Sequence, residues 1–162
     1  MTGDAAISVD GLTKRFGNRT VVDTVSLEVG RGRICGFLGP NGSGKTTTLR
    51  MICGLLIPDG GGGEVLGMDL LTQRGLIKRR IGYMTQRFSL YQDLSIRENL
   101  DFFAGIYGVP FAEREEKRRW VLAFSGLEGK EDLVTGSLPG GWKQRVAFGA
   151  CIMHEPQVLF LD

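Results

Sequence analysis

The sequence predicts an α/β fold with a core sheet of buried strands, an antiparallel β subdomain at the start of the chain, and a helical subdomain inserted later. The runs 34–38 and 158–161 are apolar throughout, as in parallel strands that are covered on both faces. The segment 21–29 mostly alternates apolar and polar residues, which is typical of a half-exposed antiparallel strand. Between residues 90 and 153, apolar residues recur at helical spacing.

The first half of the chain is expected to form short strands around one helix. β-branched and apolar runs predict strands at 7–9, 21–29, 34–38, 64–66 and 81–84. The helix that follows residue 46 has one apolar stripe, made of Leu49, Ile52, Cys53 and Leu56. Glycines such as those at 60–63 are expected in loops.

Three helices are expected in the second half. Ser95 and Glu98 have the spacing of a capping box, which opens a helix with Ile96, Leu100, Phe103 and Tyr107 on its apolar side. The second, over 112–124, is highly charged, and its expected apolar side consists of Trp120, Val121, Phe124 and Leu127. The third runs over 140–153, presents Trp142, Val146, Ala150 and Met153, and cannot continue through Pro156.

Composition limits the class of protein. The 162 residues fit one domain with a core, and a net charge of +2 creates no field that would attract nucleic acid. The chain has neither an apolar run of membrane-spanning length nor the layout of a signal peptide, so we expect it in the cytoplasm. Cys35, Cys53 and Cys151 lie in apolar sequence and are expected to be buried thiols.

A phosphate-binding loop is the strongest chemical signal. The pattern Gly-x-x-x-x-Gly-Lys-[Ser/Thr] is formed by Gly39, Pro40, Asn41, Gly42, Ser43, Gly44, Lys45 and Thr46. Its glycines let several backbone N–H groups point at one phosphate chain, and the following helix adds the positive end of its dipole. Lys45 is expected to reach the β- and γ-phosphates and Thr46 to ligate Mg²⁺. The pattern predicts the core sheet of a P-loop NTPase.

Two further residues are candidates for the same chemistry. Asp162 follows the apolar strand 158–161, and ligands in α/β sheets bind at the carboxyl ends of strands, so its carboxylate is a candidate for holding Mg²⁺. Gln86 follows the strand 81–84, and its amide is a candidate for holding Mg²⁺ and positioning an attacking water. An exposed loop residue is the alternative for Gln86.

Three other features stay open between a functional and a structural role. The segment Leu138, Pro139, Gly140, Gly141 and Trp142 precedes a helix and fits either an anion site or an ordinary Pro-Gly turn. Phe16 fits either a ring that stacks on a base or a core residue. His154, the only histidine, has no second metal ligand nearby and is expected in a loop or at the surface.

These elements, in this order, resemble the ATP-binding cassette family over residues 7–162, and more narrowly the ATPase subunits of drug- or polymer-export transporters. The resemblance implies that Phe16 stacks on adenine and that residues 39–46 form Walker A, with Thr47 near the α-phosphate. It also implies that Gln86 is the Q-loop glutamine, that Leu138, Gly140, Gly141 and Trp142 belong to the signature, and that Asp162 ends Walker B.

The chain departs from the family pattern at two places. Pro139 and Trp142 stand where the signature usually has serine and glutamine. The proline removes both the serine hydroxyl and a backbone N–H. In the family, Walker B is followed by a glutamate that acts as general base, whereas the sequence stops at Asp162. We therefore expect the C-terminal strands to be missing, with a core strand left uncovered, and residues 1–162 alone to bind Mg·ATP weakly and hydrolyse it negligibly.

The resemblance implies a single, C-terminally truncated nucleotide-binding domain. Its expected parts are 1–88, the β subdomain and P-loop core; 90–150, the helical subdomain; and 157–162, the Walker B strand. The intact protein is expected to pair with a second ATPase domain, as a homodimer or heterodimer, and to hydrolyse Mg·ATP to drive export through a transmembrane permease at the inner face of the cell membrane. The permease is expected to dock beside Gln86 and residues 88–107. The alternatives are a nucleotide-binding fragment without turnover and a soluble ATPase of the same family.

Overall fold

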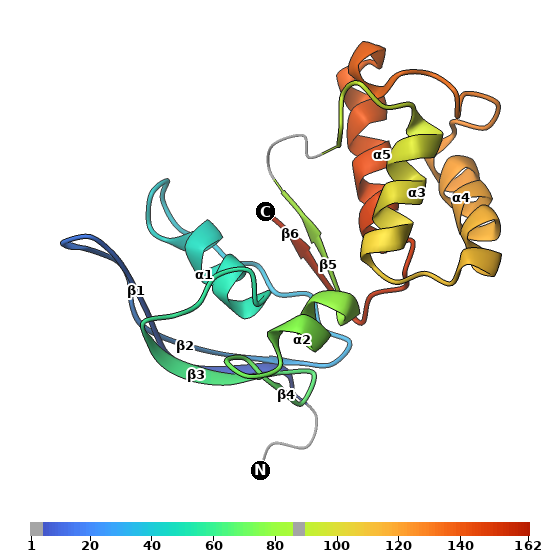
Figure 1. Ribbon diagram of the computed structural model, residues 1–162. Helices are drawn as coiled ribbons and strands as arrows, with labels where there is room; N and C mark the ends of the chain where they lie inside the picture. Colours follow the sequence, from blue (N-terminus) through green and yellow to red (C-terminus); the bar gives the residue numbers. More distant parts are fainter. Residues whose placement is uncertain (1–4, 86–89) are drawn as a thin grey trace. The chain divides into compact units, whose positions relative to one another are not determined.

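The structure is a computed structural model that describes residues 5–85 and 90–162 and consists of two compact units (Figure 1). The first unit is Met1–Ile81 and the second is Gly82–Asp162. Both strands and helices form, which confirms the predicted α/β class. None of the helices in the described ranges is long and apolar enough to cross a membrane.

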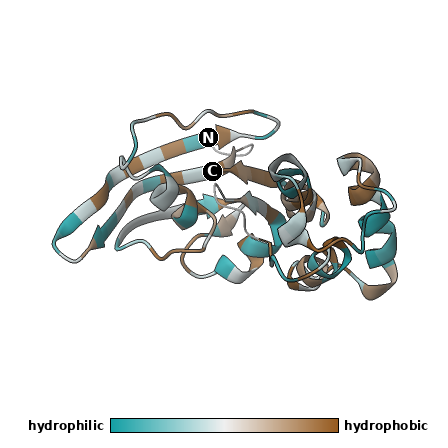
Figure 2. Cartoon of the chain, turned by 90° about the horizontal axis from the view of Figure 1, so that it is seen from above, coloured by the Kyte–Doolittle hydropathy of each residue, from teal (hydrophilic) through white to brown (hydrophobic). Residues whose placement is uncertain are grey.

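The first unit is built on an antiparallel sheet of four strands in the order β2-β1-β3-β4. Its strands are β1 (Ala5–Phe16), β2 (Arg19–Gly30), β3 (Gly60–Val65) and β4 (Met68–Asp69). The first two form a hairpin longer than the sequence predicts, and the alternation of polar and apolar residues along the strands appears as bands in Figure 2. Leu66 and Gly67 join β3 to β4 with φ of 56° and 73°, as a type I′ hairpin turn requires.

The expectation that the glycines at 60–63 form a loop is wrong, because they make up most of β3. Gly63 pairs with Val9, and a Cβ atom on Gly63 would lie 2.2 Å from the carbonyl oxygen of Ser8. The absence of side chains therefore lets the backbones of β1 and β3 approach closely. Glycine inside a strand often marks a site where another backbone approaches closely.

Helix α1 (Lys45–Ile52) packs against β1 and β2 and closes the core of the first unit. Within the predicted stripe, Ile52 and Cys53 are fully buried, and Met51 is buried beside them. Helix α2 (Arg74–Arg80), which the sequence analysis did not predict, buries only Ile77. Its other apolar residue, Leu76, is half exposed.

Residues 34–38 do not form the predicted buried strand. Ile34 is 103% exposed and Leu38 is 93% exposed, and Cys35 between them is an exposed thiol. In the described part of the chain no strand pairs with this segment. An apolar run forms a strand only when a neighbouring strand supplies hydrogen bonds and other elements bury its side chains. The apolar composition of residues 34–38 was therefore not enough to predict a strand.

The second unit contains three helices and a two-stranded sheet. The helices are α3 (Ile96–Ile106), α4 (Phe111–Ser125) and α5 (Gly140–Ile152), with a short 3₁₀ helix (Thr135–Ser137) before α5. Their shared core consists mainly of fully buried aliphatic residues, among them Ile96, Leu100, Val121, Leu127, Val146 and Met153. The sheet pairs β5 (Ile81–Met84) with β6 (Val158–Leu161).

Several predicted core positions are wrong in this unit. Trp120 and Phe124 of α4 are 47% and 56% exposed, and their rings stack on each other at the surface with centroids 5.7 Å apart. Leu161 of the predicted buried strand is also exposed. By contrast, Cys151 is buried as expected, and burial raises the pKa of its thiol to about 12, so it stays protonated and unreactive at neutral pH.

The capping box at the start of α3 forms as predicted. The Glu98 amide donates to the Ser95 hydroxyl at 3.2 Å, and the Ser95 amide donates to the Glu98 carboxylate at 2.8 Å. Hydrogen bonds from the Ser95 amide and then its hydroxyl lower the pKa of Glu98 below its ordinary value of 4.5. The contribution of the charged form to stability is therefore present above that ordinary value and is lost as pH falls through the lowered one.

We expect Ser95→Ala to lower the free energy of unfolding by about 1 kcal/mol, because the first turn of α3 loses its side-chain acceptor. Glu98→Gln is the matched control, since glutamine also completes a capping box. Glu98→Gln should lower the free energy of unfolding less than Ser95→Ala does at neutral pH. Its stability should also fall less than that of the parent protein as the pH becomes acidic. Urea unfolding followed by circular dichroism measures both, and equal losses for the two variants would contradict the assignment.

Candidate functional site

The loop at residues 39–44 turns sharply into α1. Gly42 and Gly44 have φ of 79° and 90°, and Gly44 is the N-cap residue of the helix. The Ser43 amide donates to the carbonyl oxygen of Pro40 at 3.3 Å, which closes the turn. The loop thus has the left-handed glycine conformations that curl a backbone around an anion.

Gly44 is held against β2. A Cβ atom on Gly44 would lie 2.5 Å from the carbonyl oxygen of Val21 and 3.0 Å from the Val22 side chain. Both the space and the positive φ therefore require glycine. The contact sets where α1 begins, and the buried Thr48 hydroxyl adds a bond back to the Gly44 carbonyl at 3.0 Å.

The charged group of the loop is Lys45, the first residue of α1. Its ammonium donates to the carbonyl oxygens of Gly39 and Pro40 at 2.6 and 2.7 Å, so the side chain folds back onto the loop. Thr46 and Thr47 follow in the same turn, and both are partly exposed. No acidic residue lies in this first turn, which leaves the positive end of the helix dipole for an external anion.

Phe16 lies at the end of β1, next to the β1–β2 turn, and is 51% exposed rather than a core residue. The Lys14 ammonium lies 5.7 Å from the centre of its ring and also bonds to Asp59 at 2.8 Å. An exposed ring at the end of a strand is available for stacking on a planar ligand.

Asp162 lies where β5 and β6 end side by side. Its amide donates to the carbonyl oxygen of Met84 at 3.0 Å, and the Tyr83 hydroxyl donates to its carboxylate at 2.8 Å. A hollow of about 800 Å³ is lined by both Asp162 and Gly141, so the structure brings two of the predicted site residues together within the second unit.

The predicted signature segment forms the start of α5. Pro139 is the N-cap, and its carbonyl oxygen accepts from the amides of Trp142 and Lys143 at 2.9 and 3.0 Å. Gly140 and Gly141 are exposed, whereas Leu138 is buried beneath them. The segment is therefore a helix N-terminus with two exposed glycine amides.

Trp142 packs on the core of the helices, and the Lys130 ammonium lies 4.0 Å from the centre of its ring. A cation over an indole face is attracted by the ring quadrupole. Lys130 and Tyr83 were not predicted from the sequence, because each acts through a contact with a residue distant in the chain. No spacing pattern could have indicated either contact.

Two remaining predictions concern Gln86 and His154. Gln86 lies outside the described residues. His154 is in the turn after α5 and stacks on Tyr107 with ring centroids 3.8 Å apart. Among the described residues no group of three or more histidine, cysteine and acidic side chains is arranged to hold a metal by itself.

Comparison with known proteins identifies the family of the chain. The ABC transporter family matches residues 22–162, and the chain belongs to that family. It is 46% identical, over 99% of its length, to a probable multidrug ABC transporter ATP-binding protein, YbhF, of Escherichia coli (strain K12), and covers 28% of that protein. It is 38% identical, over 96% of its length, to the Nod factor export ATP-binding protein I of Ralstonia nicotianae, and covers 49% of it.

A solved structure shows the same fold. The chain superposes on a structure titled as the ATP binding subunit of an ABC transporter with a TM-score of 0.84 and 28% identity, covering 95% of this chain and 64% of that one. The likeness confirms the predicted fold class. The chain corresponds to only part of the matched subunit. The chain spans about half or less of the length of these curated relatives.

We expect Gly44→Ala to destabilise the protein by about 1–2 kcal/mol from the left-handed backbone alone, and by more through the clash with β2. Gly36→Ala is the matched control, because a Cβ atom there meets open space. Thermal unfolding of the two variants measures the difference. A melting temperature for Gly44→Ala equal to that of Gly36→Ala would contradict the described loop geometry.

Proposed function

We propose that the chain is the nucleotide-binding part of an export-type ABC transporter ATPase, which binds Mg·ATP at residues 39–47 and in the full-length protein hydrolyses it to drive export. The observation that carries the proposal is the glycine turn into α1, with Lys45 folded onto it and no acidic residue in the first helical turn. The export direction is supported by one relative, a Nod factor export ATP-binding protein, and is in keeping with a second, a probable multidrug transporter ATP-binding protein.

In this proposal each element acts on a different part of the nucleotide. The ring of Phe16 stacks on adenine, and the amides of the loop and of the first turn of α1 bind the phosphates. Lys45 exchanges its bonds to the carbonyls of Gly39 and Pro40 for bonds to the β- and γ-phosphates. Thr47 lies near the α-phosphate. All of these groups belong to the first unit.

The donor set fits Mg²⁺. Mg²⁺ prefers oxygen ligands and keeps several waters, and when bound it neutralises charge that develops on the phosphates. The Thr46 hydroxyl and the Asp162 carboxylate are the donors we assign to it, with Gln86 as a third. Tyr83 orients the Asp162 carboxylate through its hydrogen bond of 2.8 Å.

The signature segment acts in trans in this proposal. A second ATPase domain, identical or different, pairs head to tail, so that Leu138, Gly140, Gly141 and Trp142 face the γ-phosphate bound to the partner. Pro139 offers no N–H, and the exposed amides of Gly140 and Gly141 with the dipole of α5 make the contact. Trp142, held by Lys130, takes the place of the usual glutamine.

In this proposal the ATPase domains act on a transmembrane permease, and the protein therefore lies on the cytoplasmic side of the membrane. We propose that the permease docks beside Gln86 and residues 88–107, and that residues 1–162 form part of a single nucleotide-binding domain. The half-exposed Phe102 and Tyr91, whose rings meet edge to face 4.9 Å apart, supply an apolar surface in the described part of that segment.

The test is ATP hydrolysis by the purified full-length protein, with and without Mg²⁺. We expect Lys45→Ala to reduce kcat by roughly 10²-fold, since a group that stabilises the transferring phosphoryl charge is removed. Lys78→Ala is the matched control, because it removes an equal charge from the exposed side of α2 in the same unit. Binding of ATP without Mg²⁺-dependent turnover in the full-length protein would reduce the proposal to a binding module.

A further inference from the structure

The side-chain amide of Asn99 in α3 is fully buried within the second unit. Its oxygen accepts from the Tyr91 amide at 2.8 Å. Its nitrogen donates to the carbonyl oxygens of Tyr91 and Ser95 at 2.9 and 3.0 Å, and to the Thr135 hydroxyl at 2.9 Å. A buried polar side chain satisfied on both sides specifies one arrangement of the segments that it joins.

The segment containing Thr135 also supplies backbone partners to the region before and at the start of α3. Thr135 is itself fully buried, and its amide donates to the Leu94 carbonyl at 2.9 Å. The amides of Ile96 and Arg97, which have no partner within a helix at its first turn, donate to the carbonyls of Leu133 and Glu131 at 3.0 and 2.8 Å. The segment 131–136 thus completes the N-terminus of α3.

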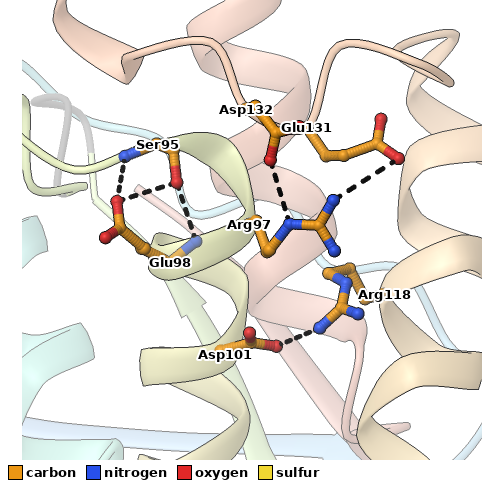
Figure 3. A network of polar contacts seen from close by, with 7 residues as sticks. All are labelled: Ser95, Arg97, Glu98, Asp101, Arg118, Glu131 and Asp132. Carbon is orange, nitrogen blue, oxygen red and sulfur yellow. Dashed lines mark hydrogen bonds and ion pairs between the residues drawn. The ribbon is translucent and has the colours of Figure 1, made fainter.

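Charged side chains of α3, α4 and residues 131–132 form ion pairs in the same region (Figure 3). Arg97 reaches Asp132 at 3.1 Å and Glu131 at 3.9 Å, and Arg118 of α4 reaches Asp101 of α3 at 2.6 Å. Exposed ion pairs contribute little to stability in water. The buried Asn99–Thr135 bond and the backbone bonds therefore make the main connection between α3 and the segment 131–136, whereas the part-buried Arg118–Asp101 pair joins α4 to α3.

The same segment leads directly into the proposed signature. The Leu138 amide donates to the Thr135 carbonyl at 3.2 Å, and Leu138 is buried. The Lys143 ammonium, on the first turn of α5, donates to the Gly136 carbonyl at 2.7 Å, and the Gly136 amide donates to the Gln92 carbonyl at 2.8 Å. A continuous set of contacts joins residues 91–95 to the start of α5.

We propose that Asn99 and Thr135 are positioning residues for the exposed amides of Gly140 and Gly141. They touch no nucleotide; they set the direction of the segment 135–139 and hence where the N-terminus of α5 points. The inference rests on the proposed function, in which those amides meet the γ-phosphate bound to the partner domain. Misplacement of such donors weakens contacts that form only in the closed, reacting state.

The position of these residues predicts a specific kinetic signature. The phosphate loop and Lys45 belong to the first unit, so binding of ATP to the open protein does not use Asn99 or Thr135. Loss of their hydrogen bond should lower kcat and the ATP-dependent pairing of two domains, and leave the affinity of the monomer for ATP unchanged. A role in stability alone would lower the melting temperature without lowering kcat selectively over ATP affinity.

The experiment uses the full-length protein with Thr135→Val, which keeps the shape of the side chain and removes its hydroxyl, and Thr135→Ser, which keeps the hydroxyl. We expect Thr135→Val to reduce kcat roughly fivefold to tenfold, equivalent to one lost hydrogen bond, with unchanged ATP affinity below the melting transition. Thr135→Ser should restore the parent kcat. Lys143→Met, which removes the bond from this partly buried side chain to Gly136, should act in the same direction and replaces Thr135→Val if that variant does not fold.

The results separate a positioning role of Thr135 from a purely structural one and from failure of the proposed function. If Thr135→Val and Lys143→Met hydrolyse ATP at the parent rate, the positioning role is wrong while the proposed function stands. If Thr135→Val loses ATP affinity and kcat together, the role is structural and the inference is again overturned. If the parent protein neither binds nor hydrolyses ATP and Lys45→Ala changes nothing, the proposed function fails and this inference fails with it.

Discussion

The close contact between Gly44 and the backbone of β2 is the constraint on which the phosphate loop depends. Because no side chain fits between Gly44 and the Val21 carbonyl, the chain turns there with a positive φ and α1 starts at the next residue. The start of α1 determines that Lys45 folds over the loop and that Met51 and Ile52 enter the core. One steric requirement thus links the anion-binding geometry to the packing of the first unit.

The second unit depends on a polar contact instead. Its core is aliphatic, yet its connection between α3 and the segment before α5 passes through the buried amide of Asn99 and the hydroxyl of Thr135. Apolar packing is weakly directional, whereas a hydrogen bond in a buried site has a required length and angle. The buried hydrogen bond therefore directs the segment before α5 more strictly than apolar packing alone would.

Local patterns predicted the features that depend on neighbouring residues. Spacing alone identified the Ser95–Glu98 capping box, the phosphate loop and the three helices to within a few residues. The errors arose where a feature depends on distant segments. Residues 34–38 are apolar but lack a pairing strand among the described residues, Trp120 and Phe124 stack on the surface, and the glycines of β3 serve a close backbone contact with β1. Tyr83 and Lys130 were missed for the same reason.

The sequence by itself determined the family and predicted the glycine-rich loop at residues 39–46, because both are encoded in short runs with fixed spacing. That these residues bind a nucleotide stays a prediction. The tertiary structure decided which side chains hold those residues in place. Tyr83 meets Asp162 across β5 and β6, Lys130 meets Trp142, and Asn99 meets Thr135 across 36 positions of sequence. Such pairs have no sequence period, since they exist only after the chain has folded and brought distant segments together.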